Sequence, residues 1–404
     1  MKHILLFATL LAALVSCQKP SNDIDNPAKP IELTTRSAEF IDKGKPFAFD
    51  FIDRINASEK NDYIVSPLSM QFLLGMILNG AQGGTAEEIC DVLGYGAGEI
   101  DAVNEFCLSM LQQLPKLDKK TKLTIASAIF VDDGWPLKDK YKADVAKYYE
   151  AKVENLDFTD NDRSLKTING WCNDHTNGLI PKILDRVDPD MLCYLLNAMY
   201  FKSDWKNQFK KSATDDEAFT DEAGVKGKVK MMKQDKTFSY LENDVFQAVF
   251  LPYGNGAFAM TVLLPQPKHT VSDVTKYLKK NGLQDSMFPC DVDLWLPRFE
   301  TKYHIKLNDI LSEMGMPSSF ASGKADFRAM SDYAGYLDFV QQDAVIKVDE
   351  EGSEAAVVSS AGMMKNAVDG PGDHVVFHAD HPFLYLITES STGAVLFAGR
   401  YSGK

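Results

Sequence analysis

The chain has 404 residues, of which 45% are hydrophobic and 25% are charged, and its formal net charge is −14. This composition supports a large folded core and excludes an intrinsically disordered chain. The net negative charge argues against nucleic-acid binding, which requires basic surfaces. No proline-rich linker, low-complexity run or internal repeat interrupts residues 35–404, so we expect one large mixed domain.

Residues 1–16 have the features of a secretion signal. Their apolar run, Ile4 to Val15, is too short to remain as a membrane-spanning helix. The following Leu14-Val15-Ser16-Cys17 resembles a bacterial lipobox, which implies cleavage before Cys17 and attachment of lipid to that cysteine. A plain signal peptide with a chance cysteine is the alternative. We expect residues 17–35 to form a flexible tether and residues 36–404 to form the folded domain.

The remaining cysteines do not form a metal-binding or disulfide framework. They are five in number and contain no Cys-x-x-Cys pair, so a zinc ribbon and a disulfide-rich scaffold are both excluded. We expect most of them to be small buried hydrophobic residues. They are Cys90, Cys107, Cys172, Cys193 and Cys290.

Hydrophobic periodicity predicts helices mainly in the first half of the chain and strands mainly in the second. Helices are expected over residues 36–57, 66–78, 85 onward, 137–149, 163–177 and 305–314. Strands are expected over residues 62–65, 122–131, 153–158, 192–201, 246–251, 258–264, 292–296, 339–348, 375–377, 383–388 and 395–399. This order predicts an α+β fold with large mixed sheets.

Three of these elements carry specific expectations. Ser66 is a natural N-cap for the helix immediately after it, with Pro67 in the first turn. Thr85 begins a capping-box pattern for the next helix. Residues 192–201 are apolar apart from Asn197, which is typical of a strand buried on both faces.

An unusual segment lies near the C-terminus, from Glu350 to Gly372. Its first half is small and proline-free, so its side chains suit later burial in a packed sheet without overpacking. Its second half is polar and contains Gly370-Pro371-Gly372, which is typical of an exposed segment that a protease can reach. An ordinary surface loop is the alternative for this segment taken alone.

Separated motifs recur along residues 36–402, together with the segment from Glu350. They are Asn61–Ser69, Asn79–Ile89, Leu196–Trp205, Val229–Met232, Leu251–Tyr253, Leu263–Pro265, Leu296–Phe299, Ala325–Phe327, His381–Phe383 and Leu396–Arg400. Each motif is weak alone, but in their order and spacing they together resemble the serpin family of suicide-substrate protease inhibitors.

The resemblance implies a serpin fold, with helices packed on large mixed sheets and an exposed C-terminal reactive loop. Its hinge would comprise Glu350, Gly352, Ser353, Glu354, Ala355 and Ala356. Ser353 would be the first residue to become buried when the loop inserts into the main sheet.

The bait bond is left open among neighbouring positions. The usual spacing from the hinge glutamate places Asn366 before the cut and Ala367 after it. Lys365, one step away, is the better anchor for a trypsin-like pocket with its buried carboxylate. Met364 would suit a chymotrypsin- or elastase-like pocket.

The resemblance also implies a polar cluster where the central strands must part, made by Ser66, Ser69 and Asn197. Trp205 would lie where insertion begins. Gln342 stands where the family often has histidine, and an amide donates and accepts hydrogen bonds without titrating. The alternatives are helix capping for the serines and simple core packing for Trp205.

These features imply an inhibitor that traps serine proteases, with cysteine proteases as a further class, and not an enzyme. The sequence contains no Gly-x-Ser-x-Gly elbow, Walker loop or His-Glu-x-x-His motif. The expected protein is a monomer without cofactor or metal, lipid-anchored through Cys17 to a bacterial membrane, either the outer membrane or another, and periplasmic or surface-exposed. The rival interpretations are a non-inhibitory binding protein of the same fold and a surface hydrolase or adhesin.

Overall fold

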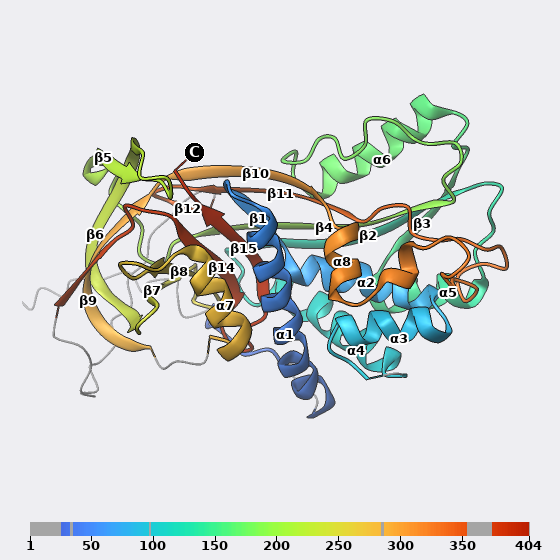
Figure 1. Cartoon of the computed structure of the whole chain (residues 1–404), viewed down its shortest axis with the longest axis horizontal. Coiled ribbons are helices and arrows are strands. Elements are labelled where there is room, and N and C mark those ends of the chain that lie inside the picture. Colours follow the sequence, from blue (N-terminus) through green and yellow to red (C-terminus); the bar gives the residue numbers. More distant parts are fainter. Residues whose placement is uncertain (1–25, 33–34, 97, 284–286, 354–373, 404) are drawn as a thin grey trace, which may run out of the picture.

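The computed structural model describes residues 26–32, 35–96, 98–283, 287–353 and 374–403. Its helices are α1 (Thr35–Ser58), α2 (Pro67–Gly80), α3 (Gly83–Val92), α4 (Ile100–Gln113), α5 (Asp139–Tyr149), α6 (Asn161–His175), α7 (Val271–Asn281) and α8 (Asn308–Met314). Figure 1 shows α2 to α5 on one side of the long strands and α6 on the other.

The largest sheet has nine strands in the order β1-β15-β14-β8-β7-β6-β9-β13, with β5 added beside β6. The strands are β1 (Tyr63–Val65), β5 (Asp215–Thr220), β6 (Lys226–Glu242), β7 (Phe246–Pro252), β8 (Phe258–Pro265), β9 (Phe288–Pro297), β13 (His374–His378), β14 (Phe383–Glu389) and β15 (Val395–Tyr401). Every residue of β8, β14 and β15 is buried, which explains their nearly continuous apolar sequences.

Two smaller groups of strands run along the molecule. One has the order β12-β4-β2-β3 and the other pairs β10 with β11. These strands are β2 (Lys122–Asp132), β3 (Lys152–Leu156), β4 (Cys193–Asp204), β10 (Phe299–Lys306), β11 (Gln341–Val348) and β12 (Gly352–Ser353). Parallel pairing of β2 with β3 and of β9 with β13 makes the sheets mixed. The predicted α+β architecture is therefore confirmed.

Helix α2 explains much of the core because all its residues are buried. A helix that is apolar on every face has to lie inside the protein. Ser66 is its N-cap, as predicted: the Ser66 hydroxyl accepts a hydrogen bond from the Ser69 N–H at 3.1 Å, and Pro67 occupies the first helical position. This cap brings Ser66 and Ser69 to the underside of β4 and β11.

Two local predictions were wrong. Helix α3 starts at Gly83, so Thr85 lies inside it and is not its cap; its hydroxyl instead accepts from the Asp326 N–H at 3.0 Å. Ile305 belongs to β10, opposite Gln342, and the helix begins only at Asn308. The alternating exposure of Lys302 to Lys306 shows the two-residue period of a strand and not the longer period of a helix.

The N-terminal boundary also differs from the expectation. Residues 26–32, expected to belong to the tether, contact the folded domain. The Asn26 side chain donates to Asp118 Oδ1 at 2.7 Å, and the Ile31 N–H donates to the Ser391 hydroxyl at 3.0 Å. Ile31 is buried. These hydrogen bonds and the buried Ile31 side chain hold residues 26–32 against the folded domain. Residues 26–32 therefore do not act as part of a tether.

The predicted signal segment, residues 1–16, and Cys17 lie outside the described residues. Within the described ranges, no helix has both the length and the apolar character needed to cross a bilayer. The other cysteines are free thiols, all buried except Cys193, which is half-buried. Burial raises the pKa of Cys193 to about 12, so this thiol is protonated at neutral pH.

Candidate functional site

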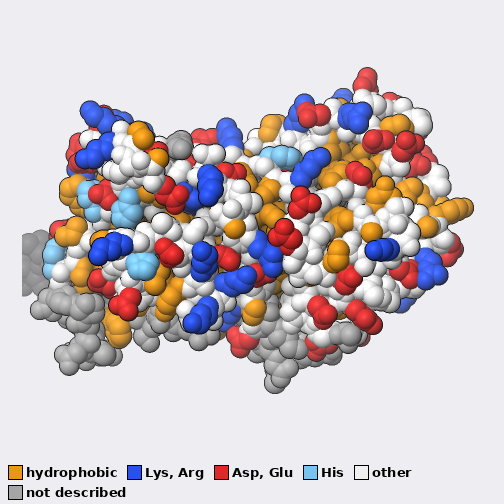
Figure 2. All heavy atoms as spheres, in the orientation of Figure 1, with side chains coloured by type: hydrophobic (Ala, Val, Ile, Leu, Met, Phe, Trp, Pro, Cys, Tyr) orange, Lys and Arg blue, Asp and Glu red, His pale blue; other side chains and the backbone are white. Residues whose placement is uncertain are grey.

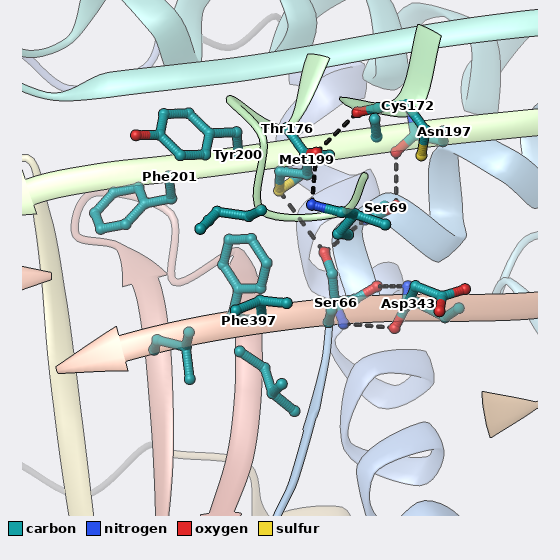
Figure 3. A pocket seen from close by; sticks show the side chains of 18 of the residues that line it. Ser66, Ser69, Cys172, Thr176, Asn197, Met199, Tyr200, Phe201, Asp343 and Phe397 are labelled. Carbon is teal, nitrogen blue, oxygen red and sulfur yellow. Dashed lines mark hydrogen bonds between the residues drawn. The ribbon is translucent and has the colours of Figure 1, made fainter. Parts of the chain in front are cut away.

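A cavity of about 300 Å³ separates β4 from β11. The two strands run side by side and in the same direction, yet they belong to different sheets and form no ladder with each other (Figure 3). Both therefore offer backbone hydrogen-bonding groups to the space between them. A strand added between them would meet a ladder edge on each side.

Side chains of β4 alternate in burial. Leu196 and Ala198 border the cavity and are buried in a cluster with Ile168 and Trp171 of α6. Asn197, Met199 and Phe201 also line the cavity but are only half-buried. The prediction that this strand is buried on both faces was therefore wrong, because no strand among the described residues closes the gap toward β11.

Ser66 connects α2 to β11 inside this gap. Its backbone N–H donates to Gln342 Oε1 at 2.7 Å, and Gln342 Nε2 donates to the Ser66 carbonyl at 3.0 Å. The Ser66 hydroxyl also donates to the Leu396 carbonyl of β15 at 2.6 Å. Gln342 thus uses both halves of its amide, a pairing that does not depend on protonation.

Ser69 makes the matching connection to β4. Its hydroxyl donates to Asn197 Oδ1 at 2.6 Å, while Asn197 Nδ2 donates to the Ala126 carbonyl at 3.2 Å and the Ser127 hydroxyl at 3.1 Å, both in β2. Four of the five predicted sheet-opening residues are therefore assembled into one network. The start of α2 joins two strands that have no bonds between them, and the polar groups remain satisfied while the strands stand apart.

The fifth residue, Trp205, lies just beyond the far end of β4. Its ring stacks on Tyr253 with centroids 4.5 Å apart, and its indole N–H donates to the Asp349 carbonyl at 2.8 Å. Its backbone N–H donates to the Glu351 carbonyl at 2.9 Å. Trp205 is thus both a core residue and a support for the segment that precedes the predicted insert.

The first two insertable hinge residues are already paired with β4. Gly352 lies opposite Asp204 and Ser353 opposite Ser203, in antiparallel register. Gly352 has φ = 154°, and a Cβ there would overlap the carbonyl oxygen of Ser203. Only glycine allows this backbone conformation and this close approach together.

Ser353 is 4% exposed and its hydroxyl lies 2.9 Å from the Tyr253 hydroxyl. The expectation that Ser353 becomes buried only on insertion is therefore wrong: pairing with Ser203 already covers it. Burial raises the pKa of Tyr253 well above its usual range, so its hydroxyl remains a neutral partner for Ser353.

Acidic side chains hold the backbone just before this pair. Glu350 is buried, accepts from the Thr214 hydroxyl at 2.8 Å and has Arg298 Nη1 at 3.7 Å. Glu351 pairs with Lys211, which lowers the pKa of the Glu351 carboxyl. These contacts fix the backbone at Glu350 and Glu351, immediately before the pair that Gly352 and Ser353 form with β4.

Several predicted site residues lie outside the described residues: Glu354, Ala355 and Ala356 of the hinge, the bait candidates Lys365, Asn366 and Ala367, and Cys17. Their roles stay predictions. Conversely, the hinge contacts of Tyr253 and Arg298 were not predicted, although both residues lie in motifs that carry the resemblance. No local signal marks them, because Tyr253 meets a partner 100 positions away in the sequence.

Comparison with known proteins agrees with this geometry. The family model described as "Serpin (serine protease inhibitor)" matches residues 42–403. Serpin B6 of Macaca fascicularis is 32% identical over 88% of this chain and 97% of its own length. The leukocyte elastase inhibitor of Xenopus tropicalis is 31% identical with the same coverage.

Among solved structures, Serpin48 of the insect Tenebrio molitor is similar with a TM-score of 0.80 and 25% identity, covering 92% of this chain and all of that one. The matched region includes the network around Ser66, the hinge and both ends of β4. The chain therefore belongs to the serpin family.

Proposed function

We propose that this protein inhibits serine proteases as a suicide substrate. One observation carries the proposal: the hinge pair Gly352–Ser353 already extends the ladder of β4 beside a cavity whose two flanking strands, β4 and β11, form no ladder with each other. Relatives named as inhibitors, such as the leukocyte elastase inhibitor, support the same function. In this proposal, the segment after Ser353 is both the bait and the strand that inserts.

In the proposed reaction, the protease serine attacks the carbonyl of the bait residue, and the amine of the next residue leaves. The bait residue becomes an ester on the protease. The loop remains covalently attached at Ser353 and is now free at its other end. It can then continue along β4 and carry the acylated protease with it, before water hydrolyses the ester.

The existing register specifies which residues would meet. Because Ser353 lies opposite Ser203, each later loop residue falls opposite the residue one position earlier in β4. Ser359 would then lie opposite Asn197, inside the polar network, and Glu354 opposite Lys202. A small hydroxyl meets the polar network, and opposite charges meet across the strands, so the sequence suits this register.

Insertion would satisfy backbone groups along both β4 and β11. At ~1 kcal/mol net for each hydrogen bond, a strand with the length of β4 releases on the order of 10 kcal/mol, before buried apolar area is added. This release is the proposed driving force. The intact protein stores it because the loop is tethered at both ends.

The direct test uses trypsin-like, chymotrypsin-like and elastase-like enzymes. We expect at least one detergent-resistant covalent complex, and a released C-terminal peptide that starts at Asn366 or Ala367, weighed by mass spectrometry. Lys365 offers a cation that pairs with the carboxylate of a trypsin-like pocket. With an apolar pocket, Met364 is the fallback anchor, and the released peptide would start at Lys365. Cleavage without a complex by every enzyme would instead indicate a non-inhibitory binding protein.

We further propose that lipid on Cys17 anchors the protein to a bacterial membrane, with the domain in the periplasm or at the surface. Eight residues separate Cys17 from Asn26, the first residue described against the domain. At about 3.4 Å per residue, this segment reaches at most ~30 Å. An anchored inhibitor would therefore intercept proteases close to the membrane.

A further inference from the structure

A second cavity, of about 370 Å³, lies between the start of β4 and the segment that leads into β11. Leu192 and Tyr194 line one side of it, and Gly335, Tyr336 and Phe339 line the other. Sites for small organic molecules are typically mostly apolar and enclose a few hundred cubic ångströms. Figure 2 shows hydrophobic side chains gathered toward this end of the molecule, below the position of α6. The cavity therefore has the size and the lining of a small-molecule site.

One polar group inside the cavity has no partner. Trp135 lines the cavity and is 5% exposed, and its indole N–H has no hydrogen-bond acceptor among the described residues. Almost every buried donor in a folded protein has an acceptor. Because an indole can only donate, its missing partner has to bring an acceptor atom, such as a carbonyl or ether oxygen.

Gly335 keeps the space beside the Trp135 ring open. A Cβ atom at Gly335 would lie 3.8 Å from Trp135 Cζ2, on the nitrogen-bearing side of the ring, and 3.1 Å from Leu192 Cδ1. A side chain larger than a methyl group would therefore extend into the cavity and fill it. Glycine leaves this volume free and leaves the indole N–H accessible to a molecule inside it.

The wall of the cavity is held in place by hydrogen bonds. The Ser331 hydroxyl donates to the Pro136 carbonyl at 2.8 Å, and the Leu337 N–H donates to the Ser319 carbonyl at 2.9 Å. Tyr336 lies between these two bonds in the sequence and is 49% exposed, so it borders both the cavity and the solvent. The site is therefore formed before a ligand enters it, and it has a side chain at its mouth that a ligand can pass.

Acidic side chains limit the charge of a ligand. Asp188, Asp190 and Asp338 line the cavity, and none of its described lining residues is a lysine or an arginine. An anionic ligand would meet three carboxylates without a cation in the lining, and like charges repel. The lining therefore favours an uncharged molecule.

We propose that this cavity binds an uncharged, mainly apolar small molecule whose acceptor oxygen pairs with the Trp135 indole N–H. The inference goes beyond protease inhibition and does not depend on it. Burial of the apolar part of the ligand would contribute most of the affinity. The indole N–H would select, among apolar molecules of similar shape, those that carry an acceptor.

Two probes of similar shape test the role of the indole. Acetophenone has a carbonyl oxygen where ethylbenzene has a methylene group. We would titrate the full chain with each probe and measure Kd by nuclear magnetic resonance. One net hydrogen bond corresponds to about a fivefold change in Kd. Trp135→Phe keeps an aromatic ring but removes the N–H, so it should weaken acetophenone binding about fivefold and leave ethylbenzene binding unchanged.

The indole resonances give a direct readout in the wild-type protein. The chain has four tryptophans, and the indole N–H signal that disappears in Trp135→Phe identifies Trp135. This signal should shift downfield with acetophenone, as the signal of a hydrogen-bonded proton does, and not with ethylbenzene. Benzoate, which has the same ring and a negative charge, should bind more weakly than acetophenone.

Two variants serve as controls. Trp295→Phe makes the same substitution in β9, at a residue that does not line the cavity, and should leave both Kd values unchanged. Gly335→Leu fills the space beside Trp135 and should abolish binding of both probes. A thermal melt without probe establishes that each variant is folded.

The proposal fails in three ways. If Trp135→Phe weakens both probes equally, or if Trp295→Phe reproduces its effect, the indole N–H is not the recognition group. If benzoate binds more tightly than acetophenone, the ligand class is wrong. If neither probe binds the wild-type protein at millimolar concentration, or if Gly335→Leu leaves both affinities unchanged, the cavity is not a ligand site and holds water alone.

Discussion

Replacing Ser353 with arginine should convert the proposed inhibitor into a substrate. Ser353 is 4% exposed and lies under Tyr253, so a guanidinium there has two options. It can stay buried without a partner, at a penalty of several kcal/mol. Alternatively, the hinge can leave β4, which loses the Tyr253 hydrogen bond and the ladder bonds to Ser203, about 3 kcal/mol at ~1 kcal/mol each.

The second option slows the step that competes with hydrolysis of the acyl-enzyme, because the hinge must return to β4 before the strand can insert. If about 3 kcal/mol appears in the barrier to insertion, insertion slows about 150-fold. Hydrolysis of the acyl-enzyme is then faster than strand insertion, and the protease cleaves the variant as an ordinary substrate. The assay titrates a sensitive protease with increasing inhibitor and measures both residual activity and the yield of detergent-resistant complex.

Ser353→Ala is the matched control. It removes the hydroxyl but keeps a small side chain, so the expected loss is only ~1 kcal/mol, about fivefold in the ratio of complex to cleaved product. A normal complex yield from the Ser353→Arg variant would refute the argument, because the buried pairing of Ser353 would then have no part in insertion.

Three further outcomes are expected. Nicking the loop between Met364 and Ala367 should raise the melting temperature, because insertion completes the strand arrangement; an equal or lower midpoint contradicts the stored-energy mechanism. Cys17→Ser should move an active domain from the membrane to the soluble fraction, and continued membrane retention would require another anchor. Lys211 lowers the pKa of the Glu351 carboxyl, so this ion pair stabilises the intact protein above the ordinary carboxyl pKa, and the stabilisation is lost as the pH falls below about 4. The Lys211→Ala variant should therefore show a smaller drop in melting temperature on acidification. An unchanged drop would show that the pair does not contribute to stability.

The sequence was informative where the determining contacts are local. Ser66 caps α2 as predicted because the acceptor and the Ser69 N–H are three residues apart. The burial of the hinge residue Ser353 could not be predicted, because it depends on contacts with Ser203 and Tyr253, which lie far away in the sequence. Likewise, an apolar run at β4 indicates a strand but cannot show whether a neighbour closes its other edge.

The docked N-terminal residues have a mechanical consequence. The Asn26 side chain donates to Asp118, the Thr121 hydroxyl donates to the same carboxylate at 2.9 Å, and the Thr121 and Ser203 hydroxyls lie 2.6 Å apart. Ser203 is also the residue that pairs with Ser353. Tension applied at the N-terminus therefore reaches the hinge through a short series of side-chain bonds that bypasses the hydrophobic core. A pull on the N-terminal segment therefore acts on the residue of β4 that pairs with the hinge.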